Sequence, residues 1–336
     1  MRVAILAHGK FPGGAKTAVG ILRYADHEVV AILDRDRAGE QVHDHLPDVQ
    51  DAPIVETMAD APECDALVIG IAPVGGGFDE SWRDDVRTAI ERGCDVISGL
   101  HYFLEDDDEL SALAAEAGVE LRDVRNPPDD LTVADATAND VDAHIVLTVG
   151  TDCSSGKMTG SFELRNAARE RGLDAAVVPT GQTGIMISGW GIAIDRVISD
   201  FAAGATERLV KVAGDHDVIF VEGQGALVHP AYSGVTTAIL HGSQPDSMVL
   251  CHVAGKEQFG SYENFALPAL PAYVQLYEDM AAPISDATVD AGLVNTHGMT
   301  EQDAERAIAE YSEAIDAPAT DPVRHSADDI LDAVLD

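Results

Sequence analysis

The chain has 336 residues, of which 46% are hydrophobic, and a chain of this length usually needs two domains to bury its apolar residues. Its 59 acidic residues against 21 lysines and arginines give a formal net charge of -38. Because nucleic-acid backbones and anionic membrane surfaces attract basic proteins, this charge excludes nucleic acid and membranes as partners.

Short apolar runs alternate with helical patterns through the first part of the chain. Buried strands are predicted at 2–8, 28–34, 66–72 and 94–100, and a helix is predicted over 80–92. This alternation is typical of a doubly wound parallel sheet, so we expect a Rossmann-like α/β domain over 1–125. The glycines after the first strand do not form the G-x-G-x-x-G pattern that binds dinucleotides. We therefore interpret this domain as substrate-binding or structural.

Residues 126–143 interrupt this alternation with two prolines and many carboxylates, so we predict a linker there. A second alternating series follows, and we expect an α/β domain over 144–336. Its predicted strands are 144–150, 175–179, 217–222, 247–253 and 290–296, and its predicted helices are 156–171, 191–211 and 300–315.

The segment GTDCSSGKMT, residues 150–159, holds one of only five lysines, placed between a buried run and a predicted helix. It resembles the phosphate loop G-x-x-x-x-G-K-[ST], although one extra residue separates the glycines and Met158 separates the lysine from Thr159. Backbone amides at a helix N-terminus attract anions. A tight turn with a solvent-exposed lysine is the alternative. We predict phosphate or nucleotide binding by Gly150, Thr151, Asp152, Cys153, Ser154, Ser155, Gly156, Lys157, Met158 and Thr159.

A second glycine-rich turn follows the run that ends at Glu222. An acid at the carboxyl end of a neighbouring strand holds magnesium in phosphate-loop enzymes, so Glu222, with Asp152 and Thr159, is a candidate magnesium ligand. His229 follows closely enough to approach the same place. A histidine there, or the carboxylate of Glu222, is a candidate to remove a proton from a substrate ammonium group. A hydrogen-bonded loop histidine is the alternative.

Further candidates lie in segments that follow other predicted strands. In PTGQTGIMISGWG, residues 179–191, we expect Gln182, Thr183 and Gly184 to contact a substrate carboxylate, with a purely structural glycine loop as the alternative. Tyr232 is a weaker substrate candidate. Asn295 follows the last predicted strand, where an amide can pair with the edge of adenine.

Two resemblances rest on these motifs. GTDCSSGK and VEGQG are similar to segments of dethiobiotin synthetase and the cobyrinic acid amide synthetases, which implies ATP and Mg²⁺ bound by Lys157, Thr159 and Glu222. Longer segments, among them HGKFPGGAKTA, GIAPVGGGF, DVRNPP and PTGQTGIMI, resemble a family that joins a Rossmann-like domain to a phosphate-loop domain. Some members of that family are described as D-glutamate N-acetyltransferases.

Three hypotheses stay open at this point. The resemblance favours N-acetylation of D-glutamate or a related amino acid with acetyl-coenzyme A as donor. The alternatives are a ligase or kinase that activates a substrate carboxylate with ATP and Mg²⁺, and a nucleotide-dependent regulator without chemistry. In each case we expect a homo-oligomer.

The composition also predicts the environment of the protein. The excess of acid with so few lysines resembles proteins of salt-loving archaea. The four cysteines form no C-x-x-C pair, and no apolar run reaches the roughly 18 residues of a membrane span. The amino terminus shows no signal-peptide pattern. We therefore expect a soluble, cytoplasmic protein of a halophilic archaeon.

We predict that the midpoint of thermal unfolding rises with salt, measured by circular dichroism. The Debye length falls from about 10 Å at 0.1 M salt to about 3 Å at 1 M, so mutual repulsion among the acidic side chains is screened. KCl and NaCl at equal ionic strength should give the same rise. A midpoint that does not increase in either salt contradicts the prediction.

Overall fold

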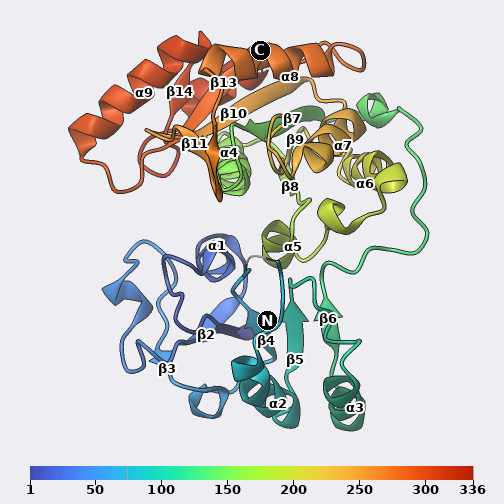
Figure 1. Cartoon of the computed structure of the whole chain (residues 1–336), viewed down its shortest axis with the longest axis vertical. Helices are drawn as coiled ribbons and strands as arrows, with labels where there is room; N and C mark the ends of the chain where they lie inside the picture. Colours follow the sequence, from blue (N-terminus) through green and yellow to red (C-terminus); the bar gives the residue numbers. More distant parts are fainter. Residues whose placement is uncertain (74, 336) are drawn as a thin grey trace. The chain divides into compact units, whose positions relative to one another are not determined.

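A computed structural model gives the structure of residues 1–73 and 75–335. The chain forms two compact units (Figure 1). The first comprises Met1–Pro127 together with Gln182–Ala193, and the second comprises Pro128–Gly181 and the chain from Ile194 onward. Within the described residues, no helix is both long enough and apolar enough to cross a membrane.

The first unit is built on a parallel sheet with the strand order β3-β2-β1-β4-β5-β6. Its strands are β1 (Arg2–Leu6), β2 (Glu28–Leu33), β3 (Ile54–Val55), β4 (Ala66–Ile69), β5 (Asp95–Ser98) and β6 (Leu121–Asp123). Its helices from the first part of the chain are α1 (Lys16–Tyr24), α2 (Arg83–Glu91) and α3 (Asp108–Ala117). β1 and β4 are buried along nearly their whole length, as expected for parallel strands covered on both faces. The predicted Rossmann-like sheet is confirmed.

A helix from the later part of the chain completes this unit. Residues Gln182–Ser188, which belong to the segment predicted to contact a substrate or to form a structural glycine loop, form α5, which contacts α1 (Figure 1). Ile185, Met186 and Ile187 are buried, so apolar packing outweighs the low helix propensity of the glycine within the segment. The predicted range 144–336 placed this segment in the second domain, whereas the structure groups it with the first unit.

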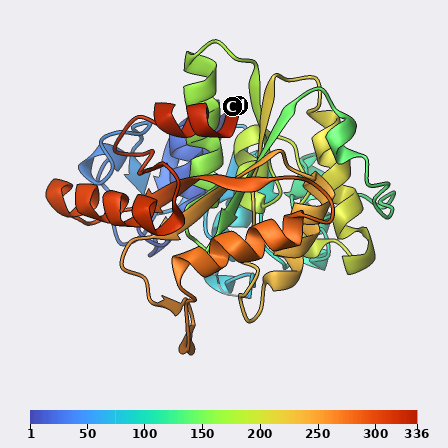
Figure 2. The same ribbon diagram turned by 90° about the horizontal axis from the view of Figure 1, so that it is seen from above.

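The second unit contains another parallel sheet, with the strand order β14-β13-β10-β7-β9-β8. Its strands are β7 (His144–Gly150), β8 (Ala175–Val178), β9 (Val218–Val221), β10 (Ser247–Val253), β13 (Thr288–Asn295) and β14 (Ala319–Thr320), with a separate antiparallel hairpin of β11 (Gln258–Phe259) and β12 (Tyr262–Ala266). Its helices are α4 (Lys157–Glu170), α6 (Ser199–Val212), α7 (Ser233–Ser243), α8 (Leu270–Ala281), α9 (Glu301–Ile315) and α10 (Asp328–Leu335). Figure 2 shows α4 and α10 on one side of this sheet and α8 on the other. The predicted second α/β domain is confirmed.

The helix predicted over 191–211 is shorter in the structure, because α6 begins only at Ser199. The predicted linker contains no regular element beyond a single 3-10 turn, Ala138–Asp140. The carboxylate of Glu207 holds it in place by accepting hydrogen bonds from the backbone amides of Asp135 and Thr137. Burial acts to raise the pKa of Glu207, but hydrogen bonds from Lys211 and Thr137 outweigh it and hold this pKa at about 2.

Strand register sets where the loops of the second unit meet. β7 pairs with β9, with Leu147 opposite Val221, and with β10, with Gly150 opposite Cys251. Because parallel strands end at the same edge of a sheet, the segments after Gly150, Val221 and Val253 emerge together.

Candidate functional site

The loop of residues 151–156 joins β7 to α4. Gly156 has φ of 104° and Ser154 has φ of 54°, so two residues of the loop adopt the left-handed backbone conformation just before the helix. A side chain at Gly150 would collide with the lysine, since its β-carbon would lie 2.7 Å from Lys157 Nζ. Glycine at position 150 therefore allows Lys157 to fold back over the loop.

The ammonium group of Lys157 lies inside the loop. Its Nζ donates to the carbonyl oxygens of Asp152 and Gly225, both at 2.8 Å, and to Ser155 Oγ at 3.3 Å. The residue is only 6% exposed. A buried cation beside the N-terminus of α4 is the arrangement that attracts a phosphate group. The solvent-exposed lysine of the alternative hypothesis is not observed.

The segment after β9 also contacts Lys157, through the carbonyl oxygen of Gly225. The backbone amide of Gly223 donates to Thr148 Oγ1 at 3.2 Å, and a β-carbon on Gly223 would lie 1.8 Å from the carbonyl oxygen of Thr148. Glu222 is buried, and its Oε2 accepts a hydrogen bond from the amide of Gly181 at 3.3 Å. The carboxylate of Glu222 is thus turned toward the segment that follows β8, and its predicted role as a magnesium ligand stays a prediction.

Asp152 anchors the β11–β12 hairpin to the loop. Its Oδ2 accepts from Lys256 Nζ at 2.6 Å and from the amide of Gly260 at 2.9 Å. Its Oδ1 accepts from the amide of Cys153 at 2.6 Å and lies 3.4 Å from His229 Nε2. Burial alone would raise the pKa of Asp152, but Lys256 and the two amides outweigh it and lower this pKa. Three donors, Lys256 and two backbone amides, are bonded to this one carboxylate, which argues against the predicted role of Asp152 as a magnesium ligand.

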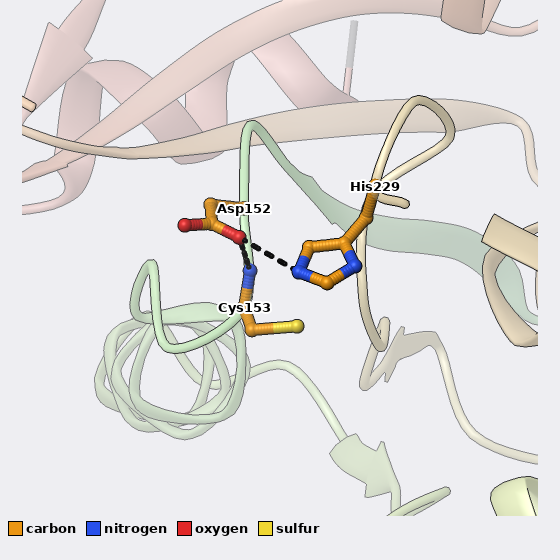
Figure 3. Close-up of side chains that lie close together, drawn as sticks. All are labelled: Asp152, Cys153 and His229. Atoms are coloured by element: carbon orange, nitrogen blue, oxygen red, sulfur yellow. Dashed lines mark hydrogen bonds and ion pairs between the residues drawn. The ribbon is translucent and has the colours of Figure 1, made fainter. Parts of the chain in front are cut away.

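His229 is buried, and its backbone surroundings fix the position of its proton. Its Nδ1 accepts hydrogen bonds from the amides of Ala231 and Tyr232, at 3.0 and 3.2 Å. A neutral imidazole has one lone pair in its plane, so the proton is on Nε2, which faces Asp152 (Figure 3). Burial lowers the pKa of His229. This tautomer directs its N–H toward Asp152 and leaves no lone pair for the predicted role as a base.

Asp152, Cys153 and His229 together have the composition of a transition-metal site, with one ligand atom of each within 4.8 Å of the others (Figure 3). A metal ion bound at His229 Nε2 would need the lone pair of that nitrogen, which places the ring proton on Nδ1. Nδ1, however, already accepts hydrogen bonds from two amides and cannot carry that proton. A metal ion would also compete with Lys256 for Asp152. Ligating histidines usually donate from their other ring nitrogen, so the donor set does not fit a metal, and we assign the cluster to positioning the loop.

The other predicted residues are dispersed. Thr183, with Gln182 and Gly184, lies on α5 in the first unit, where Thr183 Oγ1 is 2.8 Å from Thr17 Oγ1. Tyr232 is half exposed and its ring lies 4.8 Å from that of His229. Asn295 Oδ1 accepts from the amide of His297. Thr159 lies on the first turn of α4, partly buried, and Met158 is buried in the core.

Several contacts to the loop were missed from the sequence. Tyr273 and Tyr277 of α8 donate from their hydroxyls to the carbonyl oxygens of Thr151 and Gly150, both at 2.7 Å. Lys256 was also missed, although the scarcity of lysine that identified Lys157 applies to it equally. Nothing in the local pattern around the two tyrosines distinguishes them from ordinary core residues.

Comparison with known proteins places the chain in a family. Residues 35–127 match the Rossmann-like domain DUF1611_N and residues 132–331 match the P-loop domain DUF1611_C, both described as domains of unknown function. A crystal structure of a DUF1611 family protein from Anabaena variabilis is 39% identical, covers 99% of both chains and has a TM-score of 0.94. The chain therefore belongs to the DUF1611 family.

Two curated relatives carry a functional name. A protein of Tritonibacter scottomollicae named D-glutamate N-acetyltransferase is 37% identical over 82% of this chain and 83% of its own. A protein of a Pseudoalteromonas species with the same name is 37% identical over 79% of this chain and 80% of its own.

We predict that Lys157→Met weakens binding of ADP, measured by isothermal titration calorimetry. Hydrogen bonds to a charged group contribute about 1.5–3 kcal/mol, which corresponds to roughly 10- to 150-fold in the dissociation constant. Lys211→Met, the same substitution at an exposed position of α6 in the same unit, is the control and should bind as the wild type does. Equal affinity in the two variants would show that the loop does not hold the phosphates.

Proposed function

We propose that this member of the DUF1611 family transfers the acetyl group of acetyl-coenzyme A to the amino group of D-glutamate or a closely related amino acid. In this proposal the loop of residues 150–159 binds phosphates of the donor. The observation that carries it is the buried ammonium of Lys157 within a loop at the start of a helix. The two relatives named D-glutamate N-acetyltransferase support the reaction and the acceptor.

The chemistry needs a neutral amine. The nitrogen of the amino acid attacks the thioester carbonyl, the C–N bond forms, the C–S bond breaks, and coenzyme A leaves as its thiol. The amino group arrives as an ammonium ion, so a base must remove a proton before the attack. The phosphates and the thioester lie at opposite ends of coenzyme A, so a base that serves the amine does not need to belong to the phosphate loop.

The contacts of Asp152 weigh against the ATP-dependent alternative. A ligase or kinase of the phosphate-loop type uses magnesium to bridge the nucleotide phosphates. Asp152, one of the three predicted ligands, is already bonded to Lys256 and two backbone amides. Acetyl transfer needs no metal, so it is compatible with this arrangement.

The proposal also includes the setting. A salt-rich cytoplasm is supported by the net charge of -38. We also propose that the protein forms a homo-oligomer.

We predict that the protein binds acetyl-coenzyme A in isothermal titration calorimetry and converts D-glutamate and acetyl-coenzyme A to N-acetylglutamate, detected by mass spectrometry. Addition of EDTA should leave the rate unchanged, because no step depends on magnesium. L-glutamate, with the same charges and the opposite configuration, is the matched control for the acceptor. Binding of ATP with Mg²⁺ alone, with phosphate release and no acetylated product, would favour the ligase instead.

A further inference from the structure

The carboxyl edge of the sheet in the first unit is a second place where chemistry can occur. In open α/β sheets, ligands bind outside the carboxyl ends of the strands, at the point where the strand order reverses. Here the order runs outward from β1 to β3 on one side and from β4 to β6 on the other, so that point lies between β1 and β4. His8 follows the end of β1 by two residues.

His8 is paired with a buried carboxylate. Its side chain is 6% exposed, and its Nε2 lies 2.9 Å from Oδ2 of Asp85 on α2. Asp85 also accepts from Arg35 Nη2 at 2.8 Å and from the amide of Met58 at 2.7 Å. Burial would raise the pKa of Asp85, but the hydrogen bonds from His8, Met58 and Arg35 outweigh it and lower this pKa. Asp85 is therefore an acceptor, and His8 donates to it from Nε2.

The other ring nitrogen of His8 has no hydrogen-bond partner among the described residues. With the proton of the neutral ring on Nε2, the lone pair is on Nδ1. Nδ1 is buried and has no hydrogen-bond partner among residues 1–73 and 75–335. A buried acceptor without a partner is destabilising and calls for a role. His229 also lies beside an aspartate, but two amides occupy its Nδ1, so only His8 retains a lone pair that can take a proton.

Other contacts at this edge disfavour a nucleotide there. Asp34, at the end of β2, is where an acid would bind a ribose. Its carboxylate instead accepts from the amides of Gly9, Phe11 and Asp36, at 2.9, 3.2 and 3.1 Å. The acid thus holds the loop that follows β1.

The same edge offers groups that suit an acidic amino acid. Lys10 and Lys16, two of the five lysines, are both exposed around the loop that follows β1. In a chain with a net charge of -38, such cations attract carboxylates locally. α5 adds Gln182 beside Gly99, where a β-carbon would lie 2.8 Å from Gln182 Cγ. Gln182, one of the substrate residues predicted from the sequence, therefore lies within this unit, beside Gly99, which follows β5.

We propose that the carboxyl edge of this sheet binds the acidic amino acid that accepts the acetyl group, and that His8 is the catalytic residue that takes the proton from its ammonium. This inference rests on the proposed function. His8 Nδ1 accepts one ammonium proton, and the resulting imidazolium is balanced by Asp85. The freed amine forms the C–N bond, the second proton of the nitrogen goes to the departing thiolate, and His8 returns its proton to water.

The first test removes the basic nitrogen of His8 but keeps a hydrogen bond to Asp85. His8→Gln keeps a donor toward Asp85 and removes the base. We expect kcat/KM for acetylation of D-glutamate to fall about 100-fold or more, with the dissociation constant of coenzyme A unchanged. His43→Gln, at an exposed histidine of the same unit, is the control and should retain wild-type activity. His8→Gln with wild-type kcat/KM overturns the inference.

The second test does not depend on turnover. Nitrogen-15 NMR of the wild-type histidines, with His8 identified by the signal missing in His8→Gln, should show the His8 Nδ1 resonance move when D-glutamate is added. A resonance that does not move at saturating D-glutamate overturns the inference, even if the wild type acetylates. If the wild type shows no acetylation but the resonance moves, the proposed reaction fails and the binding site stands.

Discussion

The site in the second unit depends on one buried ammonium group. Lys157 holds two carbonyl oxygens from different segments, the loop after β7 and the turn after β9. This is possible only because Gly150 and Gly223 have no side chains: a β-carbon at either position would collide with the lysine or with the Thr148 carbonyl oxygen. The hydroxyls of Tyr273 and Tyr277 donate hydrogen bonds to the carbonyl oxygens of Thr151 and Gly150 and so help to hold the loop in place. The result is a cation at the start of a helix, ready to exchange carbonyl contacts for an anion.

Two histidines show how backbone contacts decide chemistry. His229 and His8 are both buried beside aspartates, and side-chain identity alone would give them the same role. The amides of residues 231 and 232 occupy Nδ1 of His229, so its remaining hydrogen faces Asp152. His8 donates to Asp85, and its other nitrogen has no hydrogen-bond partner in the part of the chain that the structure describes. One ring is a donor that positions a loop, and the other is a base.

Much of the fold could be predicted, because parallel strands that are buried on both faces have continuous apolar runs in their sequence. β7 matches its predicted range of 144–150, and β1 and β5 differ from theirs only at the ends. The packing of α5 could not be predicted, because it depends on contacts with α1 far away in the sequence. The contacts of Asp152 were hidden for the same reason: Lys256 and Gly260 come from a hairpin about a hundred residues later. Sequence located the phosphate loop, but not which of its side chains were already engaged.

A crystal structure of the protein with coenzyme A would show directly whether the loop after β7 holds the phosphates. We predict that the diphosphate lies against the amides at the start of α4, with Lys157 Nζ turned from the carbonyl oxygens of Asp152 and Gly225 onto a phosphate oxygen. Coenzyme A bound elsewhere, with Lys157 still on those carbonyl oxygens, would contradict this prediction.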